Sequence, residues 1–405
     1  MRARIGPEIL TAASDNDPTN VGTAVLVGAR TGYQLSWVAL LVAPLLAVVV
    51  TIAAHVGITA GTDLQSLIRA HYGRGLARTA LVLVVVVNLA TMTADLQAGA
   101  AGLGLLAGAS PGWFVLPLGL VLAGLLLIGK YDAIVAVLRY VLVGFLAFGA
   151  AAVLAHPDWA RVLRDSLIPT LSLRPAVLGG TLALLGTTLT SYVYLWETIS
   201  TGAESPPGQP AAGALAQSRA GAVIGAVFTA VILWFMLITA AATLGQHPRA
   251  AVTVPAAAGT LRPLAGSLAA DVFAVGLVTS AVVALPVLMA TTAYVVGAEF
   301  DWHRGLSAGV GRARGFYAVL VASVVLAAAV DLAGIPLLDM LVAASVIGGL
   351  GTPVPMILLV RLARHPAAMR GNVISARLAV AGWVIAVGLG GLGLVWAIAG
   401  LLGVL

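Results

Sequence analysis

The stretch Ser14-Asp15-Asn16-Asp17-Pro18-Thr19-Asn20 lies between two apolar runs, residues 9–13 and 21–27, that together predict a first membrane-spanning segment. A spanning helix needs roughly 20 mostly apolar residues, and each carboxylate facing lipid near its centre would cost about 3 kcal/mol. Pro18 has no amide hydrogen and disfavours helical geometry at Asp17. The stretch therefore predicts a broken helix whose polar groups face protein or a polar cavity. A simple N-cap turn of a soluble helix is the alternative.

Composition decides between these two interpretations. Hydrophobic residues make up 60% of the 405 residues and charged residues 9%, with a mean hydropathy of +1.06 and 47 glycines. Soluble domains carry about 25% charged residues, so the chain is predicted to be an all-α, multi-pass membrane protein with the lipid bilayer as its surroundings. The net charge of +6 comes from basic residues scattered singly through short loops, which argues against nucleic acid. The absence of cysteine excludes thiolate metal sites and disulfides.

Eleven hydrophobic segments follow one another along the chain, and none of the connections is long enough to form a separate soluble domain. We therefore expect residues 1–405 to form a single transmembrane domain, with the charged N-terminus leading into a first helix rather than a cleaved signal peptide. The segments are 7–29, 35–58, 78–106, 113–129, 133–155, 176–201, 218–245, 267–297, 315–331, 335–361 and 376–403.

The distribution of basic residues predicts the orientation. With the N-terminus inside, fifteen of the 21 basic residues fall on the cytoplasmic side and six on the other side. This bias predicts a cytoplasmic N-terminus and an external C-terminus. The six external residues are Arg30, Arg161, Arg164, Arg174, Arg249 and Arg262.

A second polar interruption, residues 186–192, divides the sixth segment. The first and sixth segments occupy matching places if residues 5–155 and 176–361 are two inverted repeats, with 376–403 as an additional helix. Broken helices at equivalent positions of two repeats indicate a transporter with a binding site near the middle of the membrane. An ordinary helix whose Ser and Thr hydroxyls bond to the preceding turn is the alternative for this segment.

The motifs along the chain resemble those of the Nramp divalent-metal transporters, whose signature is Asp-Pro-Gly-Asn. The similarity extends over nearly the whole chain and includes a bacterial Nramp-like variant of the opening, Asp-Asn-Asp-Pro. The residues that carry it are Gly6-Pro7, Asp17–Asn20, Gly28–Tyr33, Gly61–Leu64, Ala94–Leu96, Gly186–Thr188 and Arg314–Tyr317.

The residues of the first break suit a divalent cation. The Asp17 carboxylate and the Asn20 amide oxygen, three residues apart, offer hard oxygen donors of the kind that Mg²⁺, Mn²⁺ and Ca²⁺ prefer. The resemblance adds the main-chain carbonyl of Ser14, and the Thr187 carbonyl is a further candidate ligand. Where the family has a Met-Pro-His run, this chain has Thr190-Ser191-Tyr192.

The replacement of methionine by Thr190 affects selectivity. A thioether favours softer transition metals, whereas a hydroxyl does not discriminate against Mg²⁺ or Ca²⁺. Family members without this methionine are associated with Mg²⁺ transport. Asp15, Ser191 and Tyr192 are expected to line the cavity around the ligands.

The resemblance also implies a proton route. Asp95 matches an aspartate of the family's third helix, but the glutamate expected three residues later is Ala98, and the histidine of the sixth helix is Tyr192. Neither replacement titrates near neutrality, so weaker proton coupling is expected than in a standard member. Glu197, about two helical turns beyond Thr190, is a candidate substitute for the missing acid.

These features predict a secondary transporter of the leucine-transporter type that imports a divalent metal, Mn²⁺ or a related ion including Mg²⁺, across a bacterial plasma membrane. Alternating access would arise when segments 1, 2, 6 and 7 rock against the remainder. The metal is the substrate, no permanent cofactor is expected, and the sequence does not specify an oligomeric state. A cation-coupled symporter of an organic solute on the same fold is the main alternative. A membrane-embedded enzyme is disfavoured because neither a phosphate-binding loop nor a His-Glu-x-x-His motif occurs.

Overall fold

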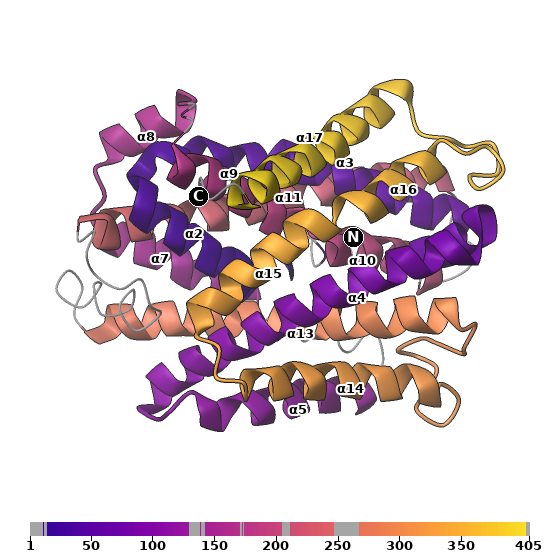
Figure 1. The fold of residues 1–405 in the computed structure, drawn as a ribbon, viewed down its shortest axis with the longest axis horizontal. Helices are drawn as coiled ribbons and strands as arrows, with labels where there is room; N and C mark the ends of the chain where they lie inside the picture. Colours follow the sequence, from indigo (N-terminus) through magenta and orange to yellow (C-terminus); the bar gives the residue numbers. More distant parts are fainter. Residues whose placement is uncertain are drawn as a thin grey trace.

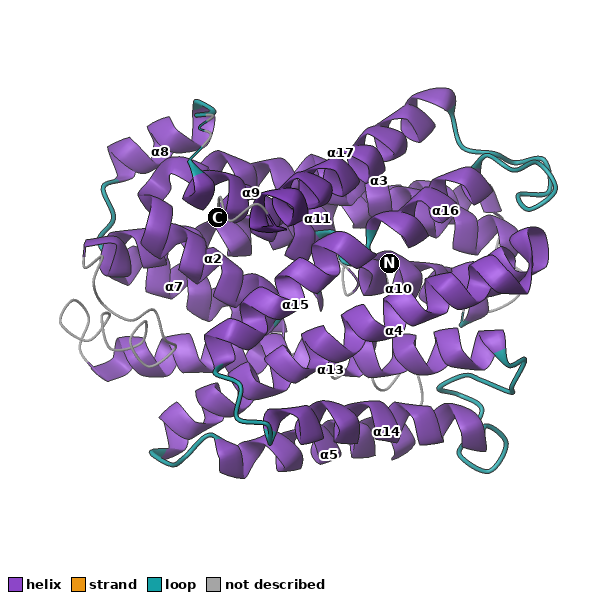
Figure 2. Cartoon of the chain, viewed as in Figure 1, coloured by secondary structure: helices purple, strands orange, loops and turns teal. Residues whose placement is uncertain are grey.

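The computed structural model describes residue 11 and residues 14–128, 138, 142–170, 172, 174–204, 211–246 and 267–401. Within these ranges the chain forms helices joined by loops and contains no strand, as Figure 2 shows. Residues 7–10, 12 and 13 of the first predicted segment, the start of the fifth and the last residues of the eleventh lie outside the described residues. The same holds for six of the basic residues used to predict orientation: Arg2, Arg4, Lys130, Arg139, Arg249 and Arg262.

The helices carry the labels of Figure 1. In chain order they are α2 (Pro18–Thr31), η1 (Gly32–Leu35), α3 (Ser36–Ala60), α4 (Leu64–Ala107), α5 (Gly112–Ile128), η2 (Leu142–Phe145), α7 (Leu146–Leu154), α8 (Trp159–Leu167), α9 (Pro175–Thr188), α10 (Ser191–Thr198), the π-helical turn η3 (Ile199–Ala203), α11 (Ala211–Thr243), η4 (Leu244–Gln246), α13 (Ser267–Glu299), α14 (Arg314–Asp331), α15 (Leu337–Gly351), α16 (Pro353–Ala363) and α17 (Ala376–Leu401).

Each of the eleven predicted segments contains helix in the described part of the chain. By length and composition, eight helical runs there could cross a membrane, or nine if the pair 142–154 and 159–167, bent by 115°, forms one span. The number is smaller than eleven because η1 joins α2 and α3 into one run and α5 has only 17 residues. The protein is therefore a multi-pass helical membrane protein.

Two local features of the fold were not predicted. α4 begins at Leu64 rather than near residue 78 and changes direction at Gly73, whose φ of +81° favours glycine. The connection 156–175, which lies between two predicted hydrophobic segments, contains the helix α8, with Asp158 as its N-cap. Both helical stretches carry charged side chains, so they do not stand out as continuous hydrophobic segments.

The helices pack in two groups. α11 packs against both α2 and α3, while α9 packs against α2 and α10 against α3. α4 packs against α13, α5, α14 and α15, and Figure 1 shows α5 and α14 side by side at one edge. α17 lies against α16, α9, α15 and α3. The first group contains the predicted moving segments 1, 2, 6 and 7.

Apolar side chains cover the outer surface of several helices. Val121 of α5 is 70% exposed and Val384 of α17 is 66% exposed. A water-facing surface of this kind would be unfavourable, whereas lipid accepts it. The exposed faces of α5 and α17 are therefore suited to contact the hydrocarbon core.

The close contact of α2 and α11 depends on Gly28. A Cβ at this position would overlap the Leu237 main-chain oxygen and lie 3.1 Å from the Ala240 Cβ. Small residues allow such close helix packing in membranes. We expect Gly28→Ala to lower the free energy of unfolding by about 1–3 kcal/mol through overpacking. Thermal unfolding of the purified protein would measure this, with Gly124→Ala in α5 as control, because a Cβ there meets no atom within 4 Å.

Candidate metal site

Asp17 and Pro18 define the start of α2. Asp17 has extended backbone, and its Oδ1 accepts a hydrogen bond of 2.6 Å from the main-chain N–H of Asn20. Pro18 occupies the first helical turn, where its missing amide hydrogen is not needed. The positive end of the helix dipole faces the Asp17 carboxylate, which favours its negative charge. The Asp17 side chain is fully buried, so the cap is held inside the protein.

Asn20 joins the first break to the second. Its Nδ2 donates to the main-chain oxygen of Asp15 at 2.8 Å. Its Oδ1 accepts hydrogen bonds of 3.1 Å from the hydroxyls of Thr187 and Thr188 at the end of α9. The amide is thus held in a fixed orientation by Asp15 and by the end of α9.

The second break lies between α9 and α10. α9 ends at Thr188, Leu189 leaves helical geometry, and Thr190 is extended with a ψ of 151° before α10 begins at Ser191. The last main-chain carbonyls of α9 therefore have no N–H group of a following helical turn from which to accept a hydrogen bond. Such carbonyls can serve as cation ligands inside a membrane protein.

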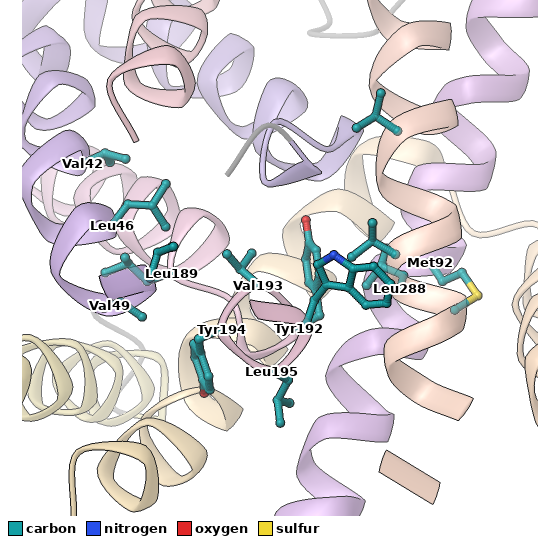
Figure 3. Packing of buried hydrophobic residues seen from close by; sticks show 14 of the residues in the cluster. Val42, Leu46, Val49, Met92, Leu189, Tyr192, Val193, Tyr194, Leu195 and Leu288 are labelled. Atoms are coloured by element: carbon teal, nitrogen blue, oxygen red, sulfur yellow. The ribbon is translucent and has the colours of Figure 1, made fainter. Parts of the chain in front are cut away.

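Tyr192 reaches from the second break to the first. Its hydroxyl lies 2.8 Å from the Ser14 main-chain oxygen and 3.0 Å from Asp17 Oδ2, and its proton is donated to this pair. Figure 3 shows the Tyr192 and Tyr194 rings leaving α10 in different directions. The structure thus brings Ser14, Asp17, Asn20, Thr187 and Tyr192 together in one hydrogen-bonded network.

Asp95 of α4 contacts the first turn of α2. Its Oδ1 accepts from the Thr19 main-chain N–H at 3.0 Å and from the Thr19 hydroxyl at 2.8 Å. Two buried carboxylates, those of Asp17 and Asp95, therefore face the N-terminus of α2. This arrangement gives Asp95 a structural task besides any role in proton transfer.

Other predicted residues are buried close to this network. The Asp15 carboxylate and the hydroxyls of Thr190 and Ser191 have no hydrogen-bond partner in the part of the chain that the structure describes. Buried polar atoms without a protein partner are costly, so their presence fits a site that takes a polar or charged substrate. Glu197 is fully buried in α10.

Carboxylate and histidine side chains alone would not provide enough ligands for a metal ion at this site. Among the described residues no three His, Cys, Asp or Glu side chains are grouped so as to hold a metal ion. A cation here would depend on main-chain carbonyls and the Asn20 amide together with the Asp17 carboxylate. Hard oxygen donors of this mixed kind suit Mg²⁺, Mn²⁺ and Ca²⁺.

Further polar contacts around the first break were not predicted. Asn16 Nδ2 donates to the Thr229 hydroxyl of α11 at 3.3 Å, and the Ser280 hydroxyl of α13 donates to the Asn16 main-chain oxygen. Thr188 and Thr19 lie within the polar stretches quoted above, so their proximity to the site was detectable. Thr229 and Ser280 are isolated small polar residues in apolar helices, and only the fold identifies them.

A cavity of about 340 Å³ lies next to the site, between α2, α9, α15 and α17. Arg30 and Trp396 are among its lining residues, as are Thr23 and Ser345, whose hydroxyls are 3.0 Å apart. Thr23 is three residues beyond Asn20, about one helical turn. The cavity therefore reaches to within one turn of the candidate ligands.

The family model described as natural resistance-associated macrophage protein-like, Nramp, matches residues 8–399. The chain belongs to the Nramp family. This is a family of transporters, not of enzymes. The divalent metal cation transporter MntH of Deinococcus radiodurans is 32% identical over 283 residues, which span 68% of this chain and 64% of that protein.

Solved structures show the same architecture as this Nramp chain. A manganese transporter of Eremococcus coleocola matches with a TM-score of 0.79 at 22% identity, covering 96% of this chain and 85% of that one. MhsT, solved with L-phenylalanine, matches with a TM-score of 0.62 at 15% identity, covering 98% and 99%. These likenesses confirm the leucine-transporter-type fold class. The assignment of individual residues to the metal and proton sites stays a prediction.

Proposed function

We propose that this chain is a secondary transporter that imports a divalent metal ion, Mn²⁺ or a related ion including Mg²⁺. The observation that carries the proposal is the buried network in which Ser14, Asp17 and Asn20 meet residues of the second break. A buried carboxylate beside oriented carbonyl and amide oxygens provides both charge and hard ligands for a dehydrated dication. Membership in the Nramp family supports the same conclusion.

The proposed ligands are the Asp17 carboxylate, the Asn20 amide oxygen, the main-chain oxygens of Ser14 and Thr187, and the Thr190 hydroxyl. Asp15, Ser191 and Tyr192 surround them. The ligands come from α2 and from the α9–α10 break, which belong to one helix group, while Asp95 belongs to the other. Movement of the first group against the second would expose the ion to each side in turn.

The proposed location is a bacterial plasma membrane, with the N-terminus in the cytoplasm and the C-terminus outside. The orientation follows from the distribution of basic residues. In this orientation the cavity that contains Arg30 opens toward the exterior, where it would serve as the approach to the ion site. Import through this cavity agrees with the relationship to the bacterial MntH transporter.

Transport in proteoliposomes tests the proposed function directly. Uptake of Mn²⁺, Mg²⁺ and Ca²⁺ should be compared with and without an imposed pH gradient. We expect saturable uptake of at least one of these ions. Amino acids should be assayed in parallel, because cation-stimulated uptake of such a solute without metal flux would instead support the organic-solute symporter.

Proton coupling is proposed to run through Asp95 and Glu197 and to be weak. Asp95→Asn removes the titratable group but keeps an oxygen that can accept the Thr19 hydrogen bonds. We expect this variant to remain folded and to show a smaller acceleration of metal uptake by an inward pH gradient. Simultaneous recording of metal and proton flux would measure the change. Tight one-to-one proton entry that persists in Asp95→Asn would contradict the route.

A further inference from the structure

The Tyr192 hydroxyl bridges two groups that are proposed to bind the ion. It lies 2.8 Å from the Ser14 main-chain oxygen and 3.0 Å from Asp17 Oδ2, and the side chain is fully buried. Both oxygens are acceptors, and the phenol offers one proton to the pair. The hydroxyl therefore provides, in neutral form, the positive end of a dipole at the place where the two oxygens converge.

This hydrogen bond competes with metal coordination at the same two oxygens. A divalent ion binds carbonyl and carboxylate oxygens at about 2.0–2.6 Å, and an ion held between the Ser14 oxygen and Asp17 Oδ2 would occupy the place toward which the phenol proton points. The O–H proton cannot point at these oxygens while a dication lies between them, because the ion would repel it. Metal binding must therefore turn the phenol proton away from Ser14 and Asp17.

The same contact addresses a problem of the return step. After releasing its ion, a transporter must reorient with a buried carboxylate and a buried carbonyl that have lost their cation. Leaving such groups without a partner in a closed, low-dielectric site is costly. The Tyr192 hydroxyl, which α10 holds next to both groups, is a hydrogen-bond donor that removes much of this cost.

We propose that Tyr192 acts as an internal substitute for the cation, closing the two breaks on each other so that the protein can return without metal. The inference rests on the proposed function. It adds that the metal-free protein can reorient, and so sustain net uptake, without a proton that neutralises the empty site. In the metal-free protein, Tyr192 then acts as a positioning residue that holds Ser14 and Asp17 against α10.

The test compares net uptake with exchange in Tyr192→Phe, which removes only the hydroxyl. Net uptake of Mn²⁺ into vesicles without internal Mn²⁺ requires the empty return, whereas exchange against saturating internal Mn²⁺ does not. We expect the ratio of exchange to net uptake to rise roughly tenfold, the value of one hydrogen bond to a charged acceptor. Because both rates come from the same vesicles, the ratio does not depend on the fraction of folded protein.

Tyr194→Phe is the matched control. Tyr194 lies in the same helix and is equally buried, but its hydroxyl donates to the Thr352 main-chain oxygen at 3.0 Å. Its loss should leave the ratio at the parental value. As a second measurement, Mn²⁺ should bind Tyr192→Phe more tightly than the parent, because the competing hydrogen bond is gone.

Different outcomes separate this inference from the proposed function. An unchanged ratio in Tyr192→Phe, or weaker Mn²⁺ binding together with equal losses in exchange and net uptake, would overturn the substitute-cation role. Asp17→Asn serves as the other arm. If the parent exchanges no metal, or if Asp17→Asn exchanges it like the parent, the proposed function or its site is wrong, and the inference is wrong with it.

Discussion

Asp17→Asn is expected to reduce metal binding and transport to background while the protein remains folded. Asparagine is as good an N-cap as aspartate, so the hydrogen bond from the Asn20 main-chain N–H to residue 17 can persist. The substitution removes the charge that would offset a dehydrated dication inside the membrane. Uptake of Mn²⁺ into proteoliposomes and calorimetric titration of the purified protein would measure the loss.

Asp158→Asn provides the control for this result. Asp158 caps α8 as Asp17 caps α2, accepting the Arg161 main-chain N–H at 3.1 Å, but it is exposed and lies outside the network. We expect this variant to bind and transport metal at the parental level. Parental transport in Asp17→Asn as well would show that the ion does not bind at the first break.

Comparison of Asp17→Asn with Asp17→Ala separates charge from capping. Alanine removes both, and a lost cap costs about 1 kcal/mol of stability. If only Asp17→Ala lost activity, and with it thermal stability, the role of Asp17 would be structural. The distinction matters because the same carboxylate both caps α2 and is proposed to bind the ion.

The sequence predicted the broad fold and the two polar interruptions because both depend on local rules. Carboxylates in an apolar segment and a proline after Asp17 are unfavourable in a continuous lipid-facing helix, whatever the rest of the chain does. The helix α8 was not predicted because it is short and carries charged residues, although its Asp158 N-cap and the helical spacing of Trp159, Val162 and Leu163 are local signals of an amphipathic helix. The early start of α4 has the same origin.

Contacts between the breaks required the three-dimensional structure. Nothing in the sequence states that Asn20 Oδ1 accepts from both Thr187 and Thr188, or that Asp95 binds Thr19. The role of Tyr192 illustrates the limit most clearly. Its position in the motif indicated a residue near the cavity, but only the fold shows its hydroxyl at the Ser14 oxygen and the Asp17 carboxylate.

Thr190→Met is expected to shift the ion preference toward Mn²⁺ and Cd²⁺ and away from Mg²⁺. The Thr190 hydroxyl is buried and has no hydrogen-bond partner among the described residues, as expected for a group that completes a substrate shell. Its methyl carbon lies 3.6 Å from where a Cβ of Gly348 would be, so the absence of that Cβ gives the longer methionine room toward α15. A thioether binds hard alkaline-earth ions poorly yet occupies their coordination position.

The expected change in relative affinity is about 1–2 kcal/mol, comparable to other single-contact discriminations. Calorimetric titration of parent and variant with Mn²⁺, Cd²⁺ and Mg²⁺ would measure it. Thr181→Met is the control, because Thr181 lies in α9, nine positions before Thr190, and its hydroxyl donates back to the Val177 carbonyl. If Thr190→Met left the ratios between the ions unchanged, Thr190 would not face the metal. Among the proposed ligands, the second break would then contribute the Thr187 carbonyl.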